Sequence, residues 1–279
     1  MSDDPTPKDI VQAMVELGTA KASHSVSELL IRGMYAGGLL AFATSLALQG
    51  ALQTNVPLVG ALIFPVGFAM IIILGMELLT GNFGVIPPAV MAGRTTAAAM
   101  LRNWVLVFIG NLLGALLYAC LLYVVLTDDG NVAGNALGDH LIALAESKTT
   151  AYEPFGYEGL VVSFVKAMLC NWMVCLGVVM GVSSKSLPAR VLGLWLPIFA
   201  FFALGFEHCV VNMFVMPMAI MLGAKITVAE WWYWNQIPVT LGNIVGGFLF
   251  TGLPLYWTYR QRTGGLPAAS GVQQLHPAE

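Results

Sequence analysis

Few side chains of this sequence could carry chemistry, and those that could lie inside long apolar stretches. His208 is the one histidine of four in such a stretch, and an imidazole can donate or accept a hydrogen bond and titrate near neutral pH. Glu77 and Glu207 each end a Leu-Gly-x-Glu sequence, and an asparagine stands five residues after each of them, Asn82 and Asn212. Ionisable groups at membrane depth are costly and functional by default. An imidazole in this setting is what a path for weak acids would use.

Each of these polar groups also has a structural interpretation. The two glutamates could accept hydrogen bonds from backbone N–H groups at breaks in their own helices, and this is the favoured interpretation for both. The histidine could be a packed core residue. Asn171, Asn111 and Asn243 lie in apolar stretches and could either join neighbouring helices or line a path as hydrogen-bond donors.

The polar residues belong to a pattern that occurs twice. A Gly-Asn-x-x-Gly phrase follows each glutamate, at 110–114 and at 242–246. The distance from glutamate to this asparagine is 34 residues in the first copy (111 − 77) and 36 in the second (243 − 207). Such a duplication is typical of channels and transporters built on internal repeats. Glycines four residues apart predict a face on which two helices pack closely.

The composition excludes a water-soluble protein. Hydrophobic residues make up 58% of the chain and charged residues only 10%. Six apolar segments are each long enough to cross a bilayer, which takes about 20 helical residues. They lie at 28–50, 57–92, 102–126, 158–181, 189–222 and 234–258. We therefore predict an all-α integral membrane protein with six transmembrane helices.

The second and fifth of these spans are expected to be interrupted. The first break is predicted at Thr80-Gly81-Asn82 and the second around Glu207-His208. Each half, 28–126 and 158–260, has three spans, so the two repeats must be inverted in the membrane relative to each other. Non-helical backbone at membrane depth survives only against protein or a water-lined cavity. The two breaks are therefore expected to face each other and to line a path.

The basic residues predict the orientation. Nine of the twelve lysines and arginines fall on the side that holds both termini, which the positive-inside rule places in the cytoplasm. They are Lys8, Lys21, Arg32, Arg94, Arg102, Lys185, Arg190, Arg260 and Arg262. We expect a cytoplasmic N-terminal segment at 1–27, a single channel domain at 28–260, a disordered cytoplasmic tail at 261–279, and insertion in the inner (plasma) membrane. The stretch from Asp9 to Leu17 is amphipathic, and either an interfacial collar or a gate would explain it.

Four motifs, in order along the chain, closely resemble the formate/nitrite transporter family, and the resemblance covers nearly all of residues 15–260. They are the stretches 78–82, 170–176, 205–214 and 237–243. The resemblance implies an aquaporin-like six-helix protomer in a homopentamer. Each protomer would have its own path for a small monovalent anion or its acid.

The resemblance also implies roles for single residues. His208 looks like the central histidine of the path, Thr80 like the threonine that bonds it, and Asn171 like a path-lining donor. Asn243 is assigned to the same path. Lys21 resembles a lysine of the cytoplasmic vestibule and Lys148 a lysine of the outer vestibule, and Lys166 is the alternative to Lys148. Lys148 stands 23 residues before Asn171 in span four (171 − 148), whereas the family's lysine stands about sixteen residues before that asparagine.

Apolar constrictions are implied on either side of the histidine. Leu78 and Leu79 resemble the cytoplasmic constriction, with Val174 opposite, although many members have phenylalanine at the position of Leu79. Phe202 matches the bulky outer residue, and Leu74 or its neighbours match its partner in span two.

The expected function is passage of formate, either with a proton or as the neutral acid. Nitrite and hydrosulfide are the alternatives within the family, and a water or glycerol facilitator is the alternative outside it. Such a facilitator should have Asn-Pro-Ala at both breaks, and neither break has it. A structural or sensory subunit would be told apart by its failure to pass formate. We expect no enzyme activity, no cofactor and no metal; the expected partners are the anion, a proton and the lipid bilayer, and no nucleic acid.

Overall fold

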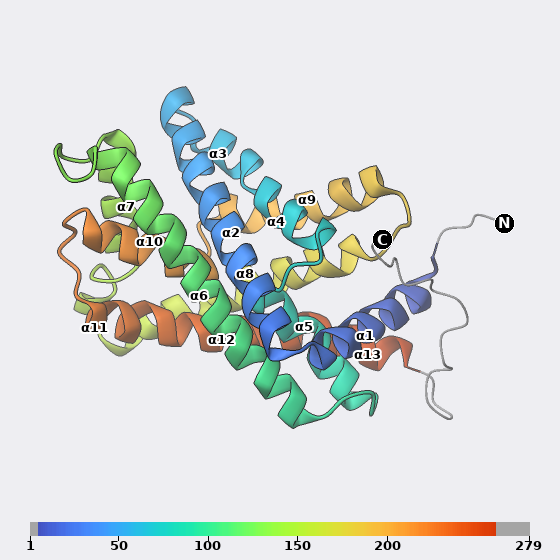
Figure 1. The fold of residues 1–279 in the computed structure, drawn as a ribbon. Coiled ribbons are helices and arrows are strands. Elements are labelled where there is room, and N and C mark those ends of the chain that lie inside the picture. Colours follow the sequence, from blue (N-terminus) through green and yellow to red (C-terminus); the bar gives the residue numbers. More distant parts are fainter. Residues whose placement is uncertain (1–4, 261–279) are drawn as a thin grey trace.

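The structure is a computed structural model that describes residues 5–260, and the expected tail at 261–279 lies outside them. The described residues form helices and connecting turns, without a β-strand among them (Figure 1). Helices cover all six ranges that the sequence predicts to be apolar spans. The chain is thus all-helical, as its composition indicates.

Within residues 5–260, four helices are long and apolar enough to cross a membrane. They are α2 (Val26–Thr54), α6 (Ala97–Thr127), α8 (Tyr157–Gly181) and a continuous helix Val228–Tyr259. The last of these is made of α11 (Val228–Glu230), the π-helical η2 (Trp231–Gln236), α12 (Ile237–Gly247), the π-helical η3 (Phe248–Gly252) and α13 (Leu253–Tyr259).

The two other apolar segments are broken into shorter helices. The segments are α3 (Pro57–Ile63), α4 (Pro65–Ile73) and α5 (Leu79–Met91) in the first half, and α9 (Leu187–Ala203) and α10 (Cys209–Met221) in the second. Gly75 and Gly205 have φ values of +66° and +65°, the left-handed region that favours glycine. The chain then runs extended to Leu78 and His208, which cap α5 and α10.

The first break lies earlier than the sequence predicted. Thr80, Gly81 and Asn82 are already in the first turn of α5, and the interruption is at 74–78. The prediction was wrong because the Thr-Gly-Asn sequence looks like a helix breaker. The conformation that ends α4 is instead the positive φ of Gly75, five residues before Thr80.

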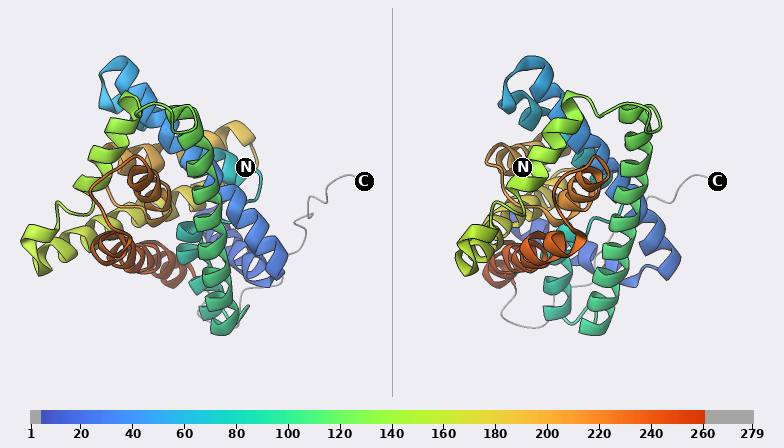
Figure 2. Two further views of the ribbon diagram at one scale, coloured as in Figure 1. Left: turned by 60° about the vertical axis from the view of Figure 1, so that its left-hand side comes forward. Right: turned by 90° about the vertical axis from the view of Figure 1, so that its left-hand side faces the viewer.

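Close helix pairs confirm the predicted packing role of the repeated glycines. α2 packs along α6, and α8 along α12 (Figures 1 and 2). A Cβ atom added to Gly114 would collide with the carbonyl of Met34, and one added to Gly246 would collide with that of Met168. These helix pairs can approach so closely only because glycine has no side chain at the contact.

Two amphipathic helices outside the predicted spans occupy corresponding places. α1 (Pro7–Ser23) is longer than the predicted Asp9–Leu17 and packs on α5, burying Val11 and Met14. α7 (Ala136–Ser147) packs on α10 in the same manner (Figure 1). Each half therefore has one amphipathic helix that packs on its second half-helix.

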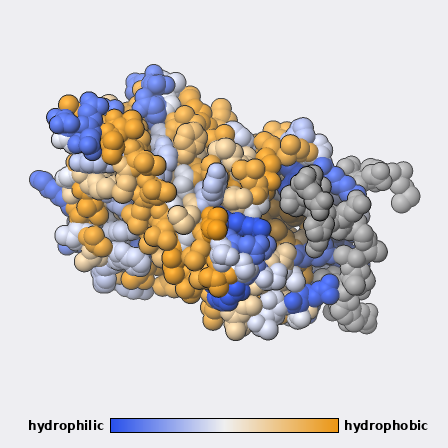
Figure 3. Space-filling view, viewed as in Figure 1, coloured by the Kyte–Doolittle hydropathy of each residue, from blue (hydrophilic) through white to orange (hydrophobic). Residues whose placement is uncertain are grey.

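The surface agrees with a membrane environment. Apolar side chains cover most of the face in Figure 3, and hydrophilic residues gather at its upper-left edge and in its right half. Many large hydrophobic side chains of α2 and α6 are exposed, among them Ile31, Tyr35, Leu117 and Leu121. An apolar surface of this extent requires lipid or another protein against it.

Candidate functional site

The centre of the site is the contact between the two broken segments. His208 Nδ1 accepts a hydrogen bond from the Val211 N–H at 3.2 Å, and His208 Nε2 lies 3.1 Å from Thr80 Oγ1. The Phe201 ring stacks on the imidazole, with centroids 5.7 Å apart. Thr80 and His208 are both buried. The hydrogen bond between them that the sequence predicted is therefore present.

The two contacts of the imidazole set its tautomer when the ring is neutral. A neutral imidazole has one N–H, and the other nitrogen is an acceptor. Because Nδ1 accepts from the Val211 backbone, the proton is on Nε2 and is donated to Thr80 Oγ1. The Thr80 hydroxyl proton is then left to donate to another group. The pair can thus offer an O–H donor to an oxygen of an anion.

Asn171 holds the backbone next to the Thr80–His208 contact in place, and its N–H groups are not available to a path. Its amide group donates to the backbone carbonyls of Thr80, at 3.0 Å, and Asn243, at 2.6 Å. Both N–H groups are used, so the predicted role as a path-lining donor is corrected. Its Oδ1 atom is buried, without a hydrogen-bond partner among residues 5–260. In this conformation Asn171 can therefore act toward a ligand only as an acceptor.

Asn243 and its counterpart Asn111 satisfy the backbone at the two breaks. Asn111 accepts from the Leu79 N–H and donates to the carbonyls of Gly33 and Glu77, at 2.8–3.0 Å. Asn243 makes the same three kinds of bond, in its case to Cys209, Ala167 and Glu207. A helix end leaves backbone groups unpaired, and burial makes that costly. The assignment of Asn243 to the substrate path is corrected, because one of its N–H groups donates to the Glu207 carbonyl at the break and the other to the Ala167 carbonyl in α8.

Glu77 accepts hydrogen bonds from side chains. Its carboxylate lies 2.8 Å from Lys21 Nζ and 2.8 Å from Asn82 Nδ2. Asn82 also donates to Asn103, which in turn donates to the Lys21 carbonyl. The glutamate is only 1% exposed, so its charge is balanced locally by the lysine.

Glu207 stands in the same arrangement in the second half. Its carboxylate lies 2.9 Å from Lys148 Nζ and 2.9 Å from Asn212 Nδ2, and Asn212 donates to Asn235. Asn235 in turn donates to the Lys148 carbonyl. The Tyr152 hydroxyl adds a further hydrogen bond to Glu207 at 2.9 Å. Each half of the molecule thus has a buried, neutral lysine–glutamate–asparagine cluster.

These clusters correct two predictions. The glutamates do not accept hydrogen bonds from backbone N–H groups at their breaks. Asn111 and Asn243 accept those hydrogen bonds instead. Lys21 and Lys148 are not free cations in a vestibule, because each is paired with a buried carboxylate.

Lys166 contacts Tyr152, with Nζ 3.3 Å from the hydroxyl and 5.4 Å from the ring centre. Burial, reinforced by Glu207, raises the pKa of the Tyr152 hydroxyl and keeps it protonated.

A signal for the clusters was present in the sequence. Lys21 precedes its glutamate by 56 residues (77 − 21) and Lys148 by 59 (207 − 148). Asn103 and Asn235, which the sequence analysis missed, follow the glutamates by 26 and 28 (103 − 77 and 235 − 207). Extending the comparison of the two halves to the segments before their first spans would have found the lysines, and extending it to the first residues of spans three and six would have found the asparagines.

The apolar residues near the breaks are only partly where they were expected. Leu78, Leu79 and Val174 are buried. Leu79, however, lines a groove between α6 and α12, with Phe83 and Ile244 beside it. Consecutive residues at a helix start point in different directions, so Leu78 and Leu79 do not form one ring side by side.

On the other side of the histidine, Phe201 takes the place predicted for Phe202. Phe201 is buried and contacts both the His208 ring and Phe64, whereas Phe202 is only partly buried and stacks on Phe64 from α9. Leu74 is 55% exposed and contributes nothing to a constriction. The prediction of Phe202 was wrong by one position. Successive residues of a helix are rotated by about 100° around its axis, so Phe201 faces His208 and Phe202 does not.

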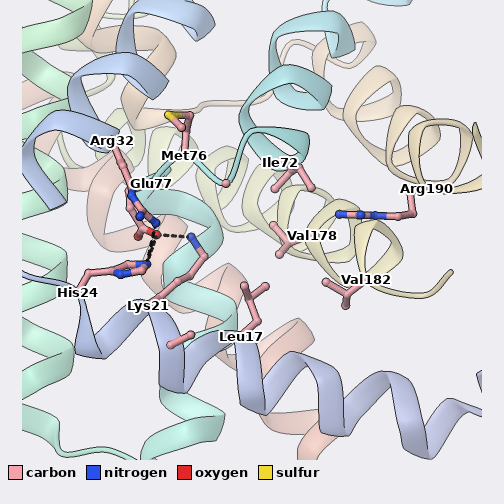
Figure 4. Close-up of a pocket in the computed structure, with 12 residues that line it drawn as sticks. Leu17, Lys21, His24, Arg32, Ile72, Met76, Glu77, Val178, Val182 and Arg190 are labelled. Carbon is pink, nitrogen blue, oxygen red and sulfur yellow. Dashed lines mark hydrogen bonds and ion pairs between the residues drawn. The ribbon is translucent and has the colours of Figure 1, made fainter. Parts of the chain in front are cut away.

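A pocket of about 180 Å³ opens beside the first cluster (Figure 4). Its walls come from α1, α2, α4, α8, α9 and the first break. The Lys21–Glu77 pair forms one side of it, with the His24 ring beside the carboxylate. The cavity is therefore bounded on one side by a buried, charge-balanced cluster.

Long apolar helices, two half-helices that meet end to end and buried polar groups at their junction define a membrane channel or transporter. The chain belongs to the formate/nitrite transporter family, whose sequence model matches residues 8–257. The family transports rather than catalyses, in agreement with the expectation that the chain is not an enzyme.

Relatives support this assignment over the whole chain. A probable formate transporter of Methanothermobacter thermautotrophicus is 35% identical, covering 91% of this chain and 97% of the relative. The formate channel FocA of Haemophilus influenzae is 33% identical, with coverages of 89% and 92%.

Two solved structures have the same fold. One, described as an FNT family ion channel, has a TM-score of 0.75 at 25% identity and covers 90% of this chain and 98% of its own. The other, a pentameric formate channel with formate bound, has a TM-score of 0.69 at 29% identity and covers 84% and 97%.

Proposed function

We propose that this chain forms a channel for small monovalent anions of weak acids, formate foremost, which pass with a proton or as the neutral acid. The observation that carries the proposal is the hydrogen bond between Thr80 and His208, which joins the amino-terminal ends of α5 and α10 at a buried position. The names of the relatives favour formate as the substrate.

The charges around the path favour a neutral passing species. Moving one charge to the bilayer centre costs at least ~2.5 kcal/mol. The ammonium groups of Lys21 and Lys148 are already balanced by Glu77 and Glu207, so neither offers a full counter-charge to an anion. Burial raises the affinity of a carboxylate for a proton. An anion that reaches the central histidine would therefore travel with a proton, and the Thr80 hydroxyl would supply a hydrogen bond to its oxygen.

The architecture that we propose is a channel domain at 28–260 with six crossings in two inverted repeats. It is supported by the matching order of elements in the two halves and by the equivalent glutamate clusters. We further propose a homopentamer, by analogy with the pentameric formate channel of similar fold. The excess of basic residues supports placing both termini on the cytoplasmic side of the inner (plasma) membrane.

Nitrite and hydrosulfide remain alternatives within the family. Nitrite shares with formate a bent, planar shape with two terminal oxygens, and hydrosulfide does not. A water or glycerol facilitator is disfavoured, because the residues that cap the two half-helices are Leu78 and His208 rather than a repeated Asn-Pro-Ala.

The test is flux into proteoliposomes that contain the purified chain. Formate, nitrite, hydrosulfide, lactate and glycerol are offered at pH 5.5 and pH 7.5, and protein-free liposomes are the control. We expect formate flux above the control, with a larger value at the lower pH. Glycerol flux without formate flux would overturn the proposal, and so would the absence of any flux from pentameric, folded protein.

A further inference from the structure

The pocket beside the first cluster holds an unusual balance of charge. Five titratable side chains line it: Lys21, His24, Arg32, Glu77 and Arg190. Two of its cations have a carboxylate partner, since Lys21 pairs with Glu77 at 2.8 Å and Arg32 pairs with Glu28, just outside the pocket, at 3.1 Å. Burial lowers the pKa of His24 from its ordinary value, although Glu77 opposes the shift, so this ring adds no charge at neutral pH.

Arg190 is the lining cation without a carboxylate within ion-pair distance in the part of the chain that the structure describes. The remaining positive charge of the pocket therefore resides on its guanidinium. Lys21, which resembles the vestibule lysine, cannot supply that charge while it neutralises Glu77.

The arginine is also held in a definite orientation. Its Nε atom donates to the Gly181 carbonyl at the end of α8, and the guanidinium extends from α9 toward the pocket, opposite Lys21 and Glu77 (Figure 4). Ile72, Val178 and Val182 lie between the two sides. The Nη groups are left with their N–H bonds unused by any other described residue. A cation against apolar walls acts on an anion more strongly than one surrounded by water.

We propose that Arg190 is the anion-docking group of this pocket and that it selects planar anions with two oxygens, such as formate and nitrite. The two Nη groups of a guanidinium match two oxygens of one anion in a forked geometry, which a single-atom anion cannot use. This inference rests on the proposed passage of formate, in which Arg190 makes the first contact within the pocket.

The flux experiment compares Arg190→Gln with Lys185→Gln, because Lys185 is a basic, exposed residue five positions earlier that does not line the pocket. We expect Arg190→Gln to raise the half-saturating formate concentration about two- to fivefold at low salt with little change in maximal flux. The difference should shrink in 1 M salt, where charges are screened over ~3 Å. Arg190→Lys keeps the charge but loses the fork, so it should restore only part of the affinity. If the Arg190→Gln and Lys185→Gln proteins have the same half-saturation as the wild type, the inference is overturned.

A second experiment does not depend on transport. Purified protein is treated with phenylglyoxal, which modifies accessible guanidinium groups, and each arginine is quantified by mass spectrometry. Sodium formate should slow modification of Arg190, whereas formamide, its uncharged analogue, and sodium chloride should do so much less. Arg94, which is exposed and outside the pocket, is the internal control and should react equally in all conditions.

The two experiments separate the inference from the proposed function. If formate protects Arg190 but no formate flux is measured, the result contradicts the proposed function and supports the docking site. Formate flux without protection would keep the proposed function and overturn the docking site. Equal protection by chloride would overturn the selectivity for two-oxygen anions.

Discussion

The Nε2 atom of His208 lies 3.1 Å from the hydroxyl oxygen of Thr80, although 128 residues separate the two along the chain. His208 caps α10 and Thr80 lies in the first turn of α5, so the hydrogen bond joins the amino-terminal ends of two half-helices. Such ends have a partial positive charge and favour a negative group nearby. One hydrogen bond thus links the two halves at the point where an anion would be stabilised.

Thr80→Val tests the hydroxyl, since valine has nearly the same shape. Removal of the hydroxyl leaves the Nε2 proton of the buried imidazole unpaired, which costs about 1–3 kcal/mol of stability. We expect a lower unfolding temperature and a lower formate flux, and Thr80→Ser should restore most of both. Wild-type flux in Thr80→Val would mean that the hydroxyl takes no part in passage.

His208→Phe removes the central donor and acceptor while it roughly keeps the ring volume. The substitution also leaves the Val211 N–H without its cap, at a cost of about 1 kcal/mol. We expect formate flux to fall and its pH dependence to change between pH 5 and 8, while the protein still assembles. An unaltered pH profile of formate flux in an assembled variant would assign the histidine to packing alone.

Lys148 and Glu207 form a buried ion pair, so their effects should be coupled. Lys148→Ala leaves an unpaired buried carboxylate and should lower stability by about 3–5 kcal/mol. The double variant Lys148→Ala/Glu207→Gln should recover part of that loss, which thermal unfolding of the wild type, Lys148→Ala, Glu207→Gln and the double variant measures. We also expect flux through Lys148→Ala to fall at every ionic strength. Additive losses of stability, or a flux defect that 1 M salt abolishes, would favour an exposed, unpaired lysine instead.

Asn111 and Asn243 should be equivalent, because each makes three hydrogen bonds to the backbone around its own break. Replacement of either by aspartate keeps the acceptor and removes both N–H donors, so the buried carbonyl of Glu77 or Glu207 at the break loses its hydrogen bond. We expect each variant to be strongly destabilised, by at least about 2 kcal/mol, in thermal unfolding. A large effect at one position and none at the other would contradict the equivalence of the breaks.

Leu78 rather than Leu79 should control the width of the path. Leu78 is the counterpart of His208, since each follows the buried glutamate and caps a half-helix. Leu79 instead lines the groove between α6 and α12. Leu78→Ala should therefore raise lactate flux relative to formate flux more than the matched Leu79→Ala does. The reverse order would restore the assignment that the sequence suggested.

The sequence alone was sufficient for the apolar helical segments and for the presence of two breaks, although it misplaced the first break. Apolar runs of spanning length predict where helices lie, because the backbone can satisfy its hydrogen bonds in lipid only within helices. The doubled glutamate and asparagine phrases predicted two corresponding breaks, and the glycine spacing predicted the close helix pairs. Each of these features is local, so composition and spacing are enough to find it.

The pairing of Thr80 with His208 was expected, but only the tertiary structure decided the partners of the other buried polar groups. Lys21 and Glu77 are 56 residues apart, and nothing within either segment indicates that α1 returns to the first break. Which of Phe201 and Phe202 faces His208 depends on the rotation of α9, and one residue changes that by about 100°. A buried donor or acceptor is satisfied by whichever element packs against it. The roles of the lysines and asparagines therefore follow from how the helices assemble, which no spacing within a single helix records.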